Sequence, residues 1–255
     1  MNIFIRLIKS IIEFSDPKSF KIFVKFILRY LFVQFLFSPF YPYAIQRIKK
    51  INKNYDLEEL VEFTQTFFFG LIATLQIKFE LLELLKILKK KKPKYILEIG
   101  TAFGGTLFLF TRIASYDAKI ISIDLPGGNF GGGYIKTRIK LYNSFSINNQ
   151  KIHLIRKNSH KKETLEEVEE ILSKNKLDLL FIDGDHTYKG VKKDFELYSP
   201  LVKEGGIIVL HDIVKSEIKG VEVSLFWDEL KSKYNITEII ENQNQNWAGL
   251  GLIKL

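Results

Sequence analysis

The chain has 255 residues, of which 46% are hydrophobic and 26% are charged, and this balance is that of a globular protein rather than a disordered one. It contains no cysteine, which excludes disulfides, thiolate catalysis and Cys-ligated zinc or iron–sulfur centres and agrees with a cytoplasmic location. The net charge of +9 is concentrated at one end: residues 1–54 hold ten Lys or Arg and two acidic residues, whereas the rest holds 28 basic and 27 acidic residues. Because the main body is close to neutral, we do not expect nucleic acid as a partner.

The first predicted element is a basic amphipathic helix within an N-terminal extension, residues 1–54. Residues 20–37 read FKIFVKFILRYLFVQFLF, and Lys21, Lys25 and Arg29 recur every four residues along one side. Cations within so short an apolar stretch argue against a transmembrane helix, and acidic residues upstream argue against a cleavable signal peptide. Two alternatives remain open. The helix lies at the inner membrane surface against anionic lipid, or it packs on its own body or on a second subunit, as in a homo-oligomer.

The remainder, residues 55–255, predicts a single α/β domain with a helical lead-in at 55–92 and a core at 93–255. After Pro93, short β-rich runs alternate with helical segments, which predicts a doubly wound, mostly parallel seven-stranded Rossmann-like sheet with helices on both faces. The predicted strands span 95–99, 119–124, 152–156, 177–183, 206–211 and a closing pair near 236–241 and 247–254. The predicted helices span about 104–116, 134–147, 163–175, 187–199 and 221–234.

A glycine-rich turn follows the first predicted strand and opens a helix. It reads Glu98-Ile99-Gly100-Thr101-Ala102-Phe103-Gly104-Gly105-Thr106. Glycine at such a turn lets a ligand approach the backbone and helix N-terminal amides. The spacing differs from the G-x-G-x-x-G of dinucleotide sites, so we do not expect a bound pyrophosphate. The second strand ends in Asp124, whose carboxylate can accept both hydroxyls of a ribose, and the two features together indicate a nucleoside-containing cofactor.

These motifs resemble the class I S-adenosylmethionine-dependent methyltransferases, in particular the cephalosporin-hydroxylase-like group of antibiotic and sugar O-methyltransferases. The resemblance covers roughly residues 75–255. It rests on the E-x-G-x-x-x-G turn with its following acid, and then on Ile182-Asp183-Gly184-Asp185-His186-Thr187-Tyr188, Gly190-Val191, Tyr198-Ser199-Pro200-Leu201-Val202, Gly205-Gly206 and His211-Asp212.

The resemblance implies a cofactor site for S-adenosylmethionine. Gly100 and Gly104 would pass close to its methionine part, Glu98 would support the turn, and Asp124 would hold the ribose. Asn158-Ser159-His160 matches the place beside the adenine where such proteins often have Asp-Ser-His, and the Asn158 amide oxygen can still accept a hydrogen bond there. The expected cofactor-binding residues are Glu98, Gly100, Thr101, Gly104, Gly105, Thr106, Asp124, Asn158, Ser159 and Asp183.

A candidate metal site lies at the ends of the fourth and fifth strands. Asp183 ends one and His211-Asp212 end the other, so adjacent strands bring three potential ligands together. This mixed donor set suits Mn²⁺, Fe²⁺ or Zn²⁺ better than Mg²⁺. His186 lies three residues after Asp183 and can take a proton from an acceptor hydroxyl. The alternative is that the two acids only cap helices while His211 packs beneath them.

The expected function is therefore O-methylation of a small polar acceptor, such as a sugar or a secondary metabolite, with a divalent metal and with His186, Asp183 and Asp212 as catalytic residues. One alternative is an NAD-dependent oxidoreductase on a similar sheet, which the glycine spacing disfavours. Another is a non-catalytic, membrane-associated binding module with a methyltransferase-like body. The loop 126–134, with five glycines, is interpreted as an active-site lid, and both tryptophans are interpreted as core or interface packing.

Overall fold

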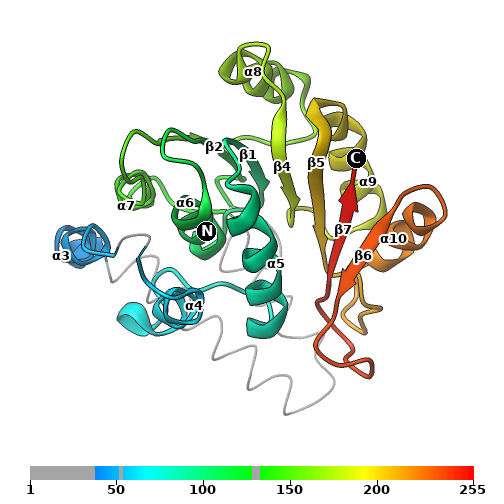
Figure 1. Cartoon of the computed structure of the whole chain (residues 1–255), viewed down its shortest axis with the longest axis horizontal. Helices are drawn as coiled ribbons and strands as arrows, with labels where there is room; N and C mark the ends of the chain where they lie inside the picture. Colours follow the sequence, from blue (N-terminus) through cyan, green and yellow to red (C-terminus); the bar gives the residue numbers. More distant parts are fainter. Residues whose placement is uncertain (1–37, 52–53, 128–132) are drawn as a thin grey trace.

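A seven-stranded sheet forms the centre of the protein (Figure 1) in a computed structural model that describes residues 38–51, 54–127 and 133–255. The strands are β1 (Tyr95–Ile99), β2 (Lys119–Ile123), β3 (Lys151–Ile155), β4 (Leu177–Ile182), β5 (Val202–His211), β6 (Ile236–Ile239) and β7 (Leu250–Lys254). They lie in the order β3-β2-β1-β4-β5-β7-β6, and β7 alone runs antiparallel to its neighbours. This confirms the predicted doubly wound, mostly parallel seven-stranded sheet.

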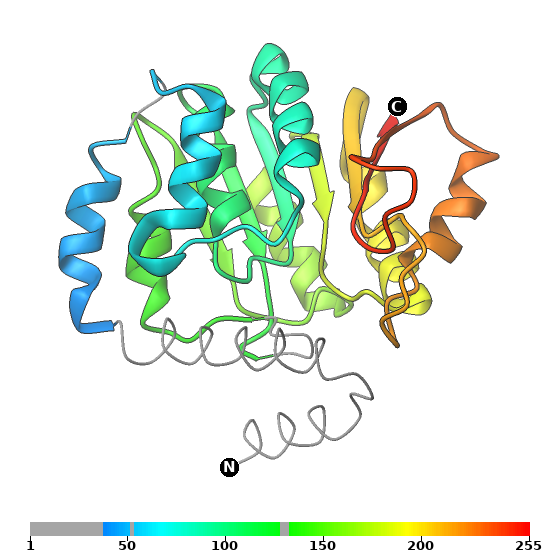
Figure 2. The same cartoon turned by 90° about the horizontal axis from the view of Figure 1, so that it is seen from below.

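Helices cover both faces of the sheet (Figures 1 and 2). The described α-helices are α3 (Tyr41–Ile48), α4 (Leu57–Thr66), α5 (Lys78–Lys91), α6 (Gly105–Ile113), α7 (Arg138–Asn143), α8 (Lys162–Leu172), α9 (Tyr188–Tyr198) and α10 (Val223–Lys231). Short 3₁₀ turns are η2 (Ser38–Phe40), η3 (Phe67–Phe69) and η5 (Ser199–Leu201). One hydrophobic core joins the sheet to α3 through α7, and a second core on the other face joins it to α8, α9 and α10.

The apolar runs of the strands follow from burial on both faces. Within β1, Ile96 belongs to one core and Leu97 to the other, because successive side chains of a strand point to opposite faces. The predicted strand at 206–211 is too short, since β5 already begins at Val202. Val202 pairs with Leu177 before a shift in register, and this early pairing extends the strand.

The helical lead-in has local signals at both ends. Asp56 and Glu59 form a capping box at the start of α4, in which each carboxylate accepts a backbone amide hydrogen bond at the helix N-terminus. At the other end, α5 stops at Lys91, and Lys92 adopts a left-handed conformation directly before Pro93. The chain therefore turns into β1 at the proline, as the sequence predicts.

Part of the N-terminal extension packs on the domain. Tyr41, Ala44 and Ile48 of α3 are buried in the first hydrophobic core, so residues 41–48 share the core of the main body. The predicted helix at 20–37 and residues 128–132 of the expected lid lie outside the described residues. In the part of the chain that the structure describes, every helix is too short or too polar to cross a membrane.

The register of the sheet positions the candidate site. Ile99 at the end of β1 pairs with Ile123 of β2 and Ile182 of β4, which in turn pairs with Leu210 of β5. The next residue of each strand or turn is therefore delivered to one edge of the sheet. These residues are Gly100, Asp124, Asp183 and His211, as expected for the ligand-binding edge of an open parallel sheet.

Candidate active site

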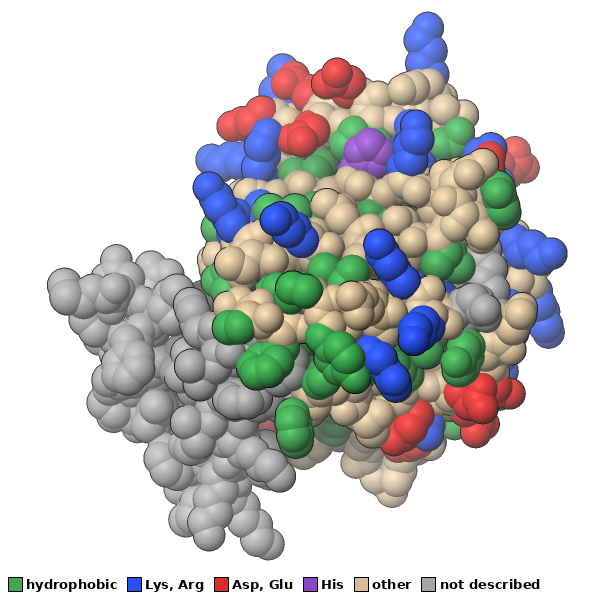
Figure 3. All heavy atoms as spheres, turned by 90° about the vertical axis from the view of Figure 1, so that its left-hand side faces the viewer, with side chains coloured by type: hydrophobic (Ala, Val, Ile, Leu, Met, Phe, Trp, Pro, Cys, Tyr) green, Lys and Arg blue, Asp and Glu red, His purple; other side chains and the backbone are tan. Residues whose placement is uncertain are grey.

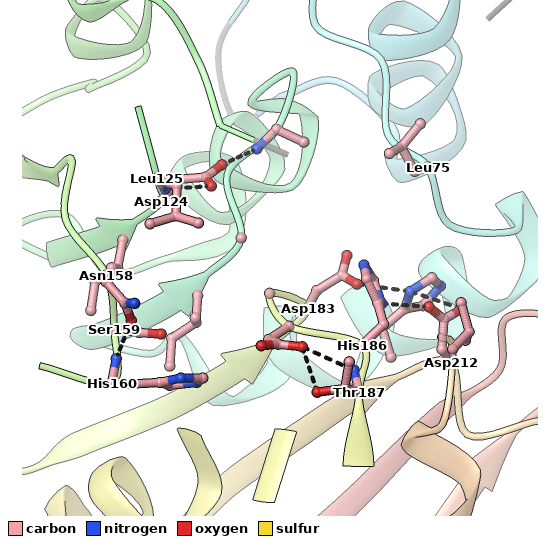
Figure 4. Close-up of a pocket in the computed structure, with 18 of the residues that line it drawn as sticks. Leu75, Asp124, Leu125, Asn158, Ser159, His160, Asp183, His186, Thr187 and Asp212 are labelled. Carbon is pink, nitrogen blue, oxygen red and sulfur yellow. Dashed lines mark hydrogen bonds and ion pairs between the residues drawn. The ribbon is translucent and has the colours of Figure 1, made fainter. Parts of the chain in front are cut away.

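A pocket with a volume of about 420 Å³ opens at this edge of the sheet. It is lined by eight of the thirteen predicted site residues, namely Gly100, Asp124, Asn158, Ser159, Asp183, His186, His211 and Asp212. Figure 4 shows Asp124 and Asn158 at one end and Asp183, His186 and Asp212 at the other. The other five predicted residues do not line it: Glu98, Thr101, Gly104, Gly105 and Thr106.

The glycines of the turn are required by packing within the chain. Gly100 has φ +100°, and a Cβ atom there would lie 2.0 Å from the carbonyl oxygen of Asp183. A Cβ atom on Gly104 would meet the ring of Tyr142 at 2.7 Å, and one on Gly105 would meet the carbonyl oxygen of Ile72 at 2.6 Å. Only glycine fits such contacts without a shift of the backbone. Of the three, Gly100 is the one whose backbone faces the pocket.

Glu98 lies beneath the turn and is fully buried. Its carboxylate accepts hydrogen bonds from the hydroxyls of Thr106 and Ser122, and the hydroxyls of Ser122 and Thr101 are 2.6 Å apart. Burial raises the pKa of Glu98 to about 8. Glu98 therefore contacts the turn from inside the protein and does not reach the pocket.

Asp124 holds the same turn from the pocket side. Its Oδ2 accepts from the backbone amides of Thr101 and Ala102 at 3.0 and 2.8 Å, and its Oδ1 accepts from the amide of Leu125 at 2.7 Å. Burial raises the pKa of Asp124 although these amides oppose the change. The Gly133 amide opposes the change as well, so four backbone amides surround this carboxylate, which also lines the pocket.

The segment after β3 forms the wall beside Asp124. The Asn158 Oδ1 accepts from the His160 amide at 2.8 Å, and the Tyr198 hydroxyl donates to the carbonyl oxygen of Ser159 at 2.7 Å. His160, the third residue of this predicted segment, also lines the pocket. Its Nε2 lies 3.3 Å from a carboxylate oxygen of the buried Asp194, and this carboxylate raises the pKa of His160. The wall is therefore fixed to α9 at two points.

Asp183 is oriented from two sides at the other end of the pocket. One oxygen accepts from the Nε2 of Gln76 at 2.6 Å, and the other lies 3.0 Å from the Nδ1 of His211. Gln76 precedes α5 and was not predicted, because nothing in its sequence neighbourhood relates it to the strand ends. The contact between Gln76 and Asp183 forms because the segment directly before α5 passes the carboxyl edge of the sheet.

His186 and Asp212 form a second imidazole–carboxylate pair. The His186 Nδ1 lies 2.8 Å from the Asp212 Oδ2. Burial disfavours the imidazolium of His186, but the carboxylates of Asp212 and Asp183 outweigh it and raise its pKa. Burial also opposes ionisation of Asp212, but His211 and His186 outweigh it and lower the pKa of Asp212 to about 2. The pair therefore favours an ionised carboxylate beside a basic imidazole.

The structure changes the candidate metal set. Among the described residues, Asp183, His186 and Asp212 can offer ligand atoms that all lie within 4.8 Å of one another. His211, predicted as the histidine of that set, is 5% exposed and turns its Nδ1 toward both carboxylates. Burial lowers its basicity, but Asp183 and Asp212 outweigh this and raise the pKa of His211 to about 9. The structure therefore places both imidazoles beside the two carboxylates, with His186 Nδ1 2.8 Å from Asp212 and the predicted ligand His211 3.0 Å from Asp183.

The pocket also has an apolar wall that the sequence did not predict. Leu75, Ile218, Val221 and Trp247 line it. Trp227 is fully buried, as expected of a core residue, whereas Trp247 is 45% exposed. The polar run of residues 241–246 directly before Trp247 is the signal that distinguishes the two, because a core tryptophan is normally flanked by apolar residues.

Comparison with known protein sequences finds a match to a described domain. Residues 97–213 match a family profile described as a methyltransferase domain. The chain is 34% identical over 140 residues to an uncharacterized protein of Acanthamoeba polyphaga mimivirus, and the matched segment covers 54% of this chain and 60% of that protein. It is 29% identical over 142 residues to an uncharacterized protein of Sinorhizobium fredii, which covers 54% of this chain and 15% of that protein. The chain thus spans less than two thirds of either relative.

Solved structures share the fold at low sequence identity. An O-methyltransferase from Bacillus cereus, in complex with S-adenosylhomocysteine (SAH), has a TM-score of 0.55 at 15% identity and covers 82% of this chain and 96% of that chain. The O-methyltransferase TomG of Streptomyces achromogenes, with S-adenosylmethionine, has a TM-score of 0.50 at 16% identity and covers 79% and 91%. CalS11, a TDP-rhamnose 3′-O-methyltransferase, has a TM-score of 0.51 at 17% identity and covers 84% and 93%.

The sequence match and the fold agree with each other. The matched residues 97–213 begin within β1 and end just after β5, so they contain the glycine-rich turn, Asp124, Asp183 and the His211-Asp212 pair. β6 and the antiparallel β7 follow the matched residues and complete the sheet. Residues 97–213 therefore match a methyltransferase domain, and the described chain has the fold of the solved O-methyltransferases named above.

Proposed function

We propose that the protein is an O-methyltransferase that transfers the methyl group of S-adenosylmethionine to a small polar acceptor, such as a sugar or a secondary metabolite, with the help of a divalent metal ion. The observation that carries this proposal is the pairing of His186 with Asp212 beside Asp183, in the same pocket that holds Asp124. The similar fold of a TDP-rhamnose 3′-O-methyltransferase supports a sugar as acceptor.

In this proposal the end of the pocket near Asp124 binds the cofactor. The Asp124 carboxylate accepts the ribose hydroxyls, the backbone at Gly100 faces the methionine part, and Asn158 and Ser159 lie beside the adenine. Their positions in the pocket support these roles. The predicted residues that do not line the pocket would support the turn without contacting the cofactor. They are Glu98, Thr101, Gly104, Gly105 and Thr106.

The other end of the pocket prepares the acceptor. When bound, S-adenosylmethionine supplies a methyl group on a sulfonium, whose sulfur keeps the electron pair of the broken carbon–sulfur bond. The acceptor oxygen forms the new bond to that methyl group and loses its proton. His186 takes the proton, and Asp212 holds the imidazole in orientation and stabilises the imidazolium that results. The carboxylates of Asp183 and Asp212 favour this step, because they raise the pKa of His186.

The same carboxylates fit a divalent metal. Two carboxylate oxygens and one imidazole nitrogen within 4.8 Å are a donor set that suits Mn²⁺, Fe²⁺ or Zn²⁺, and Mg²⁺ less well. A bound ion would lower the pKa of an acceptor hydroxyl. We assign Asp183, Asp212 and, as predicted from the strand ends, His211 to the metal, and His186 to the proton. The alternative, in which His186 completes the ligand set, is separated from this one by variants described in the Discussion.

Binding of SAH tests the proposed function. We expect SAH to bind with micromolar-range affinity in calorimetry, and Asp124→Ala to weaken binding by about 2 kcal/mol, because charge-assisted hydrogen bonds to the ribose are lost. Asp228→Ala, in an exposed position of α10, is the control and should leave the affinity unchanged. Binding of NAD⁺ in place of SAH would establish the oxidoreductase alternative. Binding of SAH without turnover on any hydroxylated acceptor would favour the non-catalytic module.

We also propose that the face carrying α3 contacts an anionic membrane, together with the basic residues of the N-terminal extension. Figure 3 shows hydrophobic and Lys or Arg side chains interspersed on this face. Phe40, Tyr43 and Phe69 are exposed there by 55%, 54% and 76%, and the rings of Tyr43 and Phe68 contact each other, which places α3 beside η3. Exposed aromatic rings with nearby cations are typical of an interfacial membrane contact.

Vesicle binding tests the membrane contact. We expect the full chain to bind anionic vesicles at low salt and to dissociate as salt screens the cations. Deletion of residues 1–37 keeps α3 and its core contacts and should abolish binding, while Phe69→Ser should weaken it. Leu225→Ser removes another exposed apolar side chain, 56% exposed on α10 at the opposite end of the sheet, and serves as the control. A change from dimer to monomer on deletion, without vesicle binding, would favour protein packing instead.

A further inference from the structure

The apolar wall of the pocket has no part in the chemistry proposed above. Three of its residues are nevertheless next in sequence to residues that hydrogen-bond Asp183, His186 and Asp212. Trp247 lies in the loop between β6 and β7. The backbone amide of the next residue, Ala248, donates to Asp212 and helps to lower the pKa of that carboxylate. Trp247 is therefore next in sequence to the residue whose amide donates to Asp212, so a shift of the Trp247 backbone would also move this hydrogen bond.

Two other wall residues are attached in the same way. Leu75 directly precedes Gln76, whose side-chain amide donates to Asp183 at 2.6 Å. Val221 directly precedes a residue whose backbone amide donates to the carbonyl oxygen of His186 at 2.7 Å. The wall and the polar group are thus built from the same segments. A molecule that packs on the wall therefore lies in the same pocket as His186.

The loop that carries Trp247 is anchored by a buried carboxylate. Glu80 of α5 is fully buried and accepts hydrogen bonds from the Gln245 side chain at 2.7 Å, from the Gly249 amide at 3.0 Å and from the Glu241 amide at 3.3 Å. The loop is held on both sides of Trp247. A half-exposed tryptophan in a loop that is fixed in this way is a preorganised binding surface rather than a mobile side chain.

We propose that Trp247, with Leu75, Ile218 and Val221, is the acceptor subsite and that the acceptor is a ring with hydroxyl groups on its rim. This inference rests on the proposed methyltransferase function and names the substrate class for the same site. The face of an indole carries a partial negative charge and attracts the C–H bonds of a sugar ring or the edge or offset face of a phenol. The rim hydroxyl then points to His186 and the two carboxylates, which fixes the orientation as expected for a pocket with few polar groups.

Fluorescence quenching can test this subsite because the chain has only two tryptophans. Trp227 is fully buried and donates to Glu238, so acrylamide quenches Trp247 selectively. The probes are methyl α-D-glucopyranoside and catechol, with 1,2-propanediol as a compound that has neighbouring hydroxyls but no ring. In the presence of saturating SAH and Mn²⁺, we expect one of the two rings to protect Trp247 from acrylamide and the diol to have no effect. The ring that protects identifies the acceptor as a sugar or a phenol.

Substitutions separate a subsite from a structural role. Saturation-transfer NMR of the ring protons should show about tenfold weaker binding to Trp247→Ala and a change within about threefold for Trp247→Phe, which keeps an aromatic face. Tyr116→Ala removes an exposed aromatic ring that does not line the pocket and should change nothing. All three variants should bind SAH as the unmodified chain does.

The failure of this inference is distinct from the failure of the proposed function. If SAH does not bind the unmodified chain, the methyltransferase function is wrong. If SAH binds but neither ring protects Trp247, or the diol protects it equally, the ring subsite is wrong while the function stands. Equal ring binding by Trp247→Ala and the unmodified chain would also overturn the subsite.

Discussion

Gln76 and Asp183 are separated by 107 positions in the chain, and the Nε2 of Gln76 donates to the Oδ2 of Asp183 at 2.6 Å. The other oxygen of Asp183 faces the Nδ1 of His211 at 3.0 Å. With a partner on each oxygen, the carboxylate is held in one orientation toward the pocket. Gln76 is therefore a positioning residue, since it acts on the site through Asp183.

Replacement of Gln76 should loosen the site without unfolding it. We expect Gln76→Leu to weaken Mn²⁺ binding by about tenfold or more, because loss of an outer hydrogen bond to a ligating group typically costs this much. Electron paramagnetic resonance of free Mn²⁺ measures the effect directly, and SAH affinity should stay the same. Gln46→Leu, at an exposed position of α3, is the control. Unchanged Mn²⁺ affinity would mean that His211 alone orients Asp183.

Chelation should stop turnover if a metal takes part. We expect excess EDTA to abolish methyl transfer, added Mn²⁺ or Mg²⁺ to restore it, and Asp183→Ala and Asp212→Ala to abolish both activity and metal dependence. His186→Ala should lower kcat by about 10²–10⁴ with SAH affinity nearly unchanged. Full activity in EDTA would rule out the metal and leave His186 or His211 as a base that acts alone.

The two histidines can be separated by the same Mn²⁺ measurement. If His186 acts only on the proton, as we propose, Mn²⁺ binds His186→Ala almost normally. If His186 is the third ligand, its variant loses Mn²⁺ affinity and His211→Ala loses less; if His211 is the third ligand, the order is reversed.

The sheet was predictable because its signal is local. The apolar runs of β1 and β4 require burial on both faces, and the polar residues that follow them mark the carboxyl edge of the sheet. Asp124, Asp183 and Asp212 were found by that rule, which needs only the position of strand ends. A strand pattern is therefore enough to predict the site residues that directly follow a strand.

The rest depends on tertiary packing that a strand pattern does not encode. Gln76 and Trp247 come from loops that reach the edge from outside the parallel strands. The approach of His186 to the carboxylate of Asp212 also depends on tertiary geometry, and Asp212 itself has φ +63°, an uncommon backbone conformation for a residue other than glycine. Nothing in the spacing of the His211-Asp212 pair indicates which imidazole faces the pocket.

Gly100 should be far less tolerant of a methyl group than another left-handed glycine. A Cβ atom at Gly100 would overlap the carbonyl oxygen of Asp183 at 2.0 Å, whereas one at Gly205, which has φ +72°, would meet nothing within 4 Å. Gly205→Ala should therefore cost only the strain of the left-handed conformation, about 1–2 kcal/mol. Gly100→Ala should cost at least about 2 kcal/mol more in urea unfolding and should separate β1 from β4. Equal losses for the two variants would show that the β1–β4 contact can relax.

The pH dependence of stability should report on Glu98. Its pKa is 4.5 in the unfolded chain and is raised by burial to about 8 in the folded protein, so the folded state keeps a proton that the unfolded state releases between these values. The unfolding free energy should therefore fall as the pH rises from 4.5 to 8 and level off above 8.

Glu98→Gln has the same shape and no charge. We expect the unfolding free energy of this variant to fall less between pH 5 and 8, by on the order of 2 kcal/mol or more. The raised pKa of His211 also removes stability between pH 6.5 and about 9, but it does so in both proteins, so the difference between them in urea unfolding isolates Glu98. Parallel pH profiles for the two proteins would mean that Glu98 ionises in the folded state at its ordinary pKa, with Ser122 and Thr106 compensating for its burial.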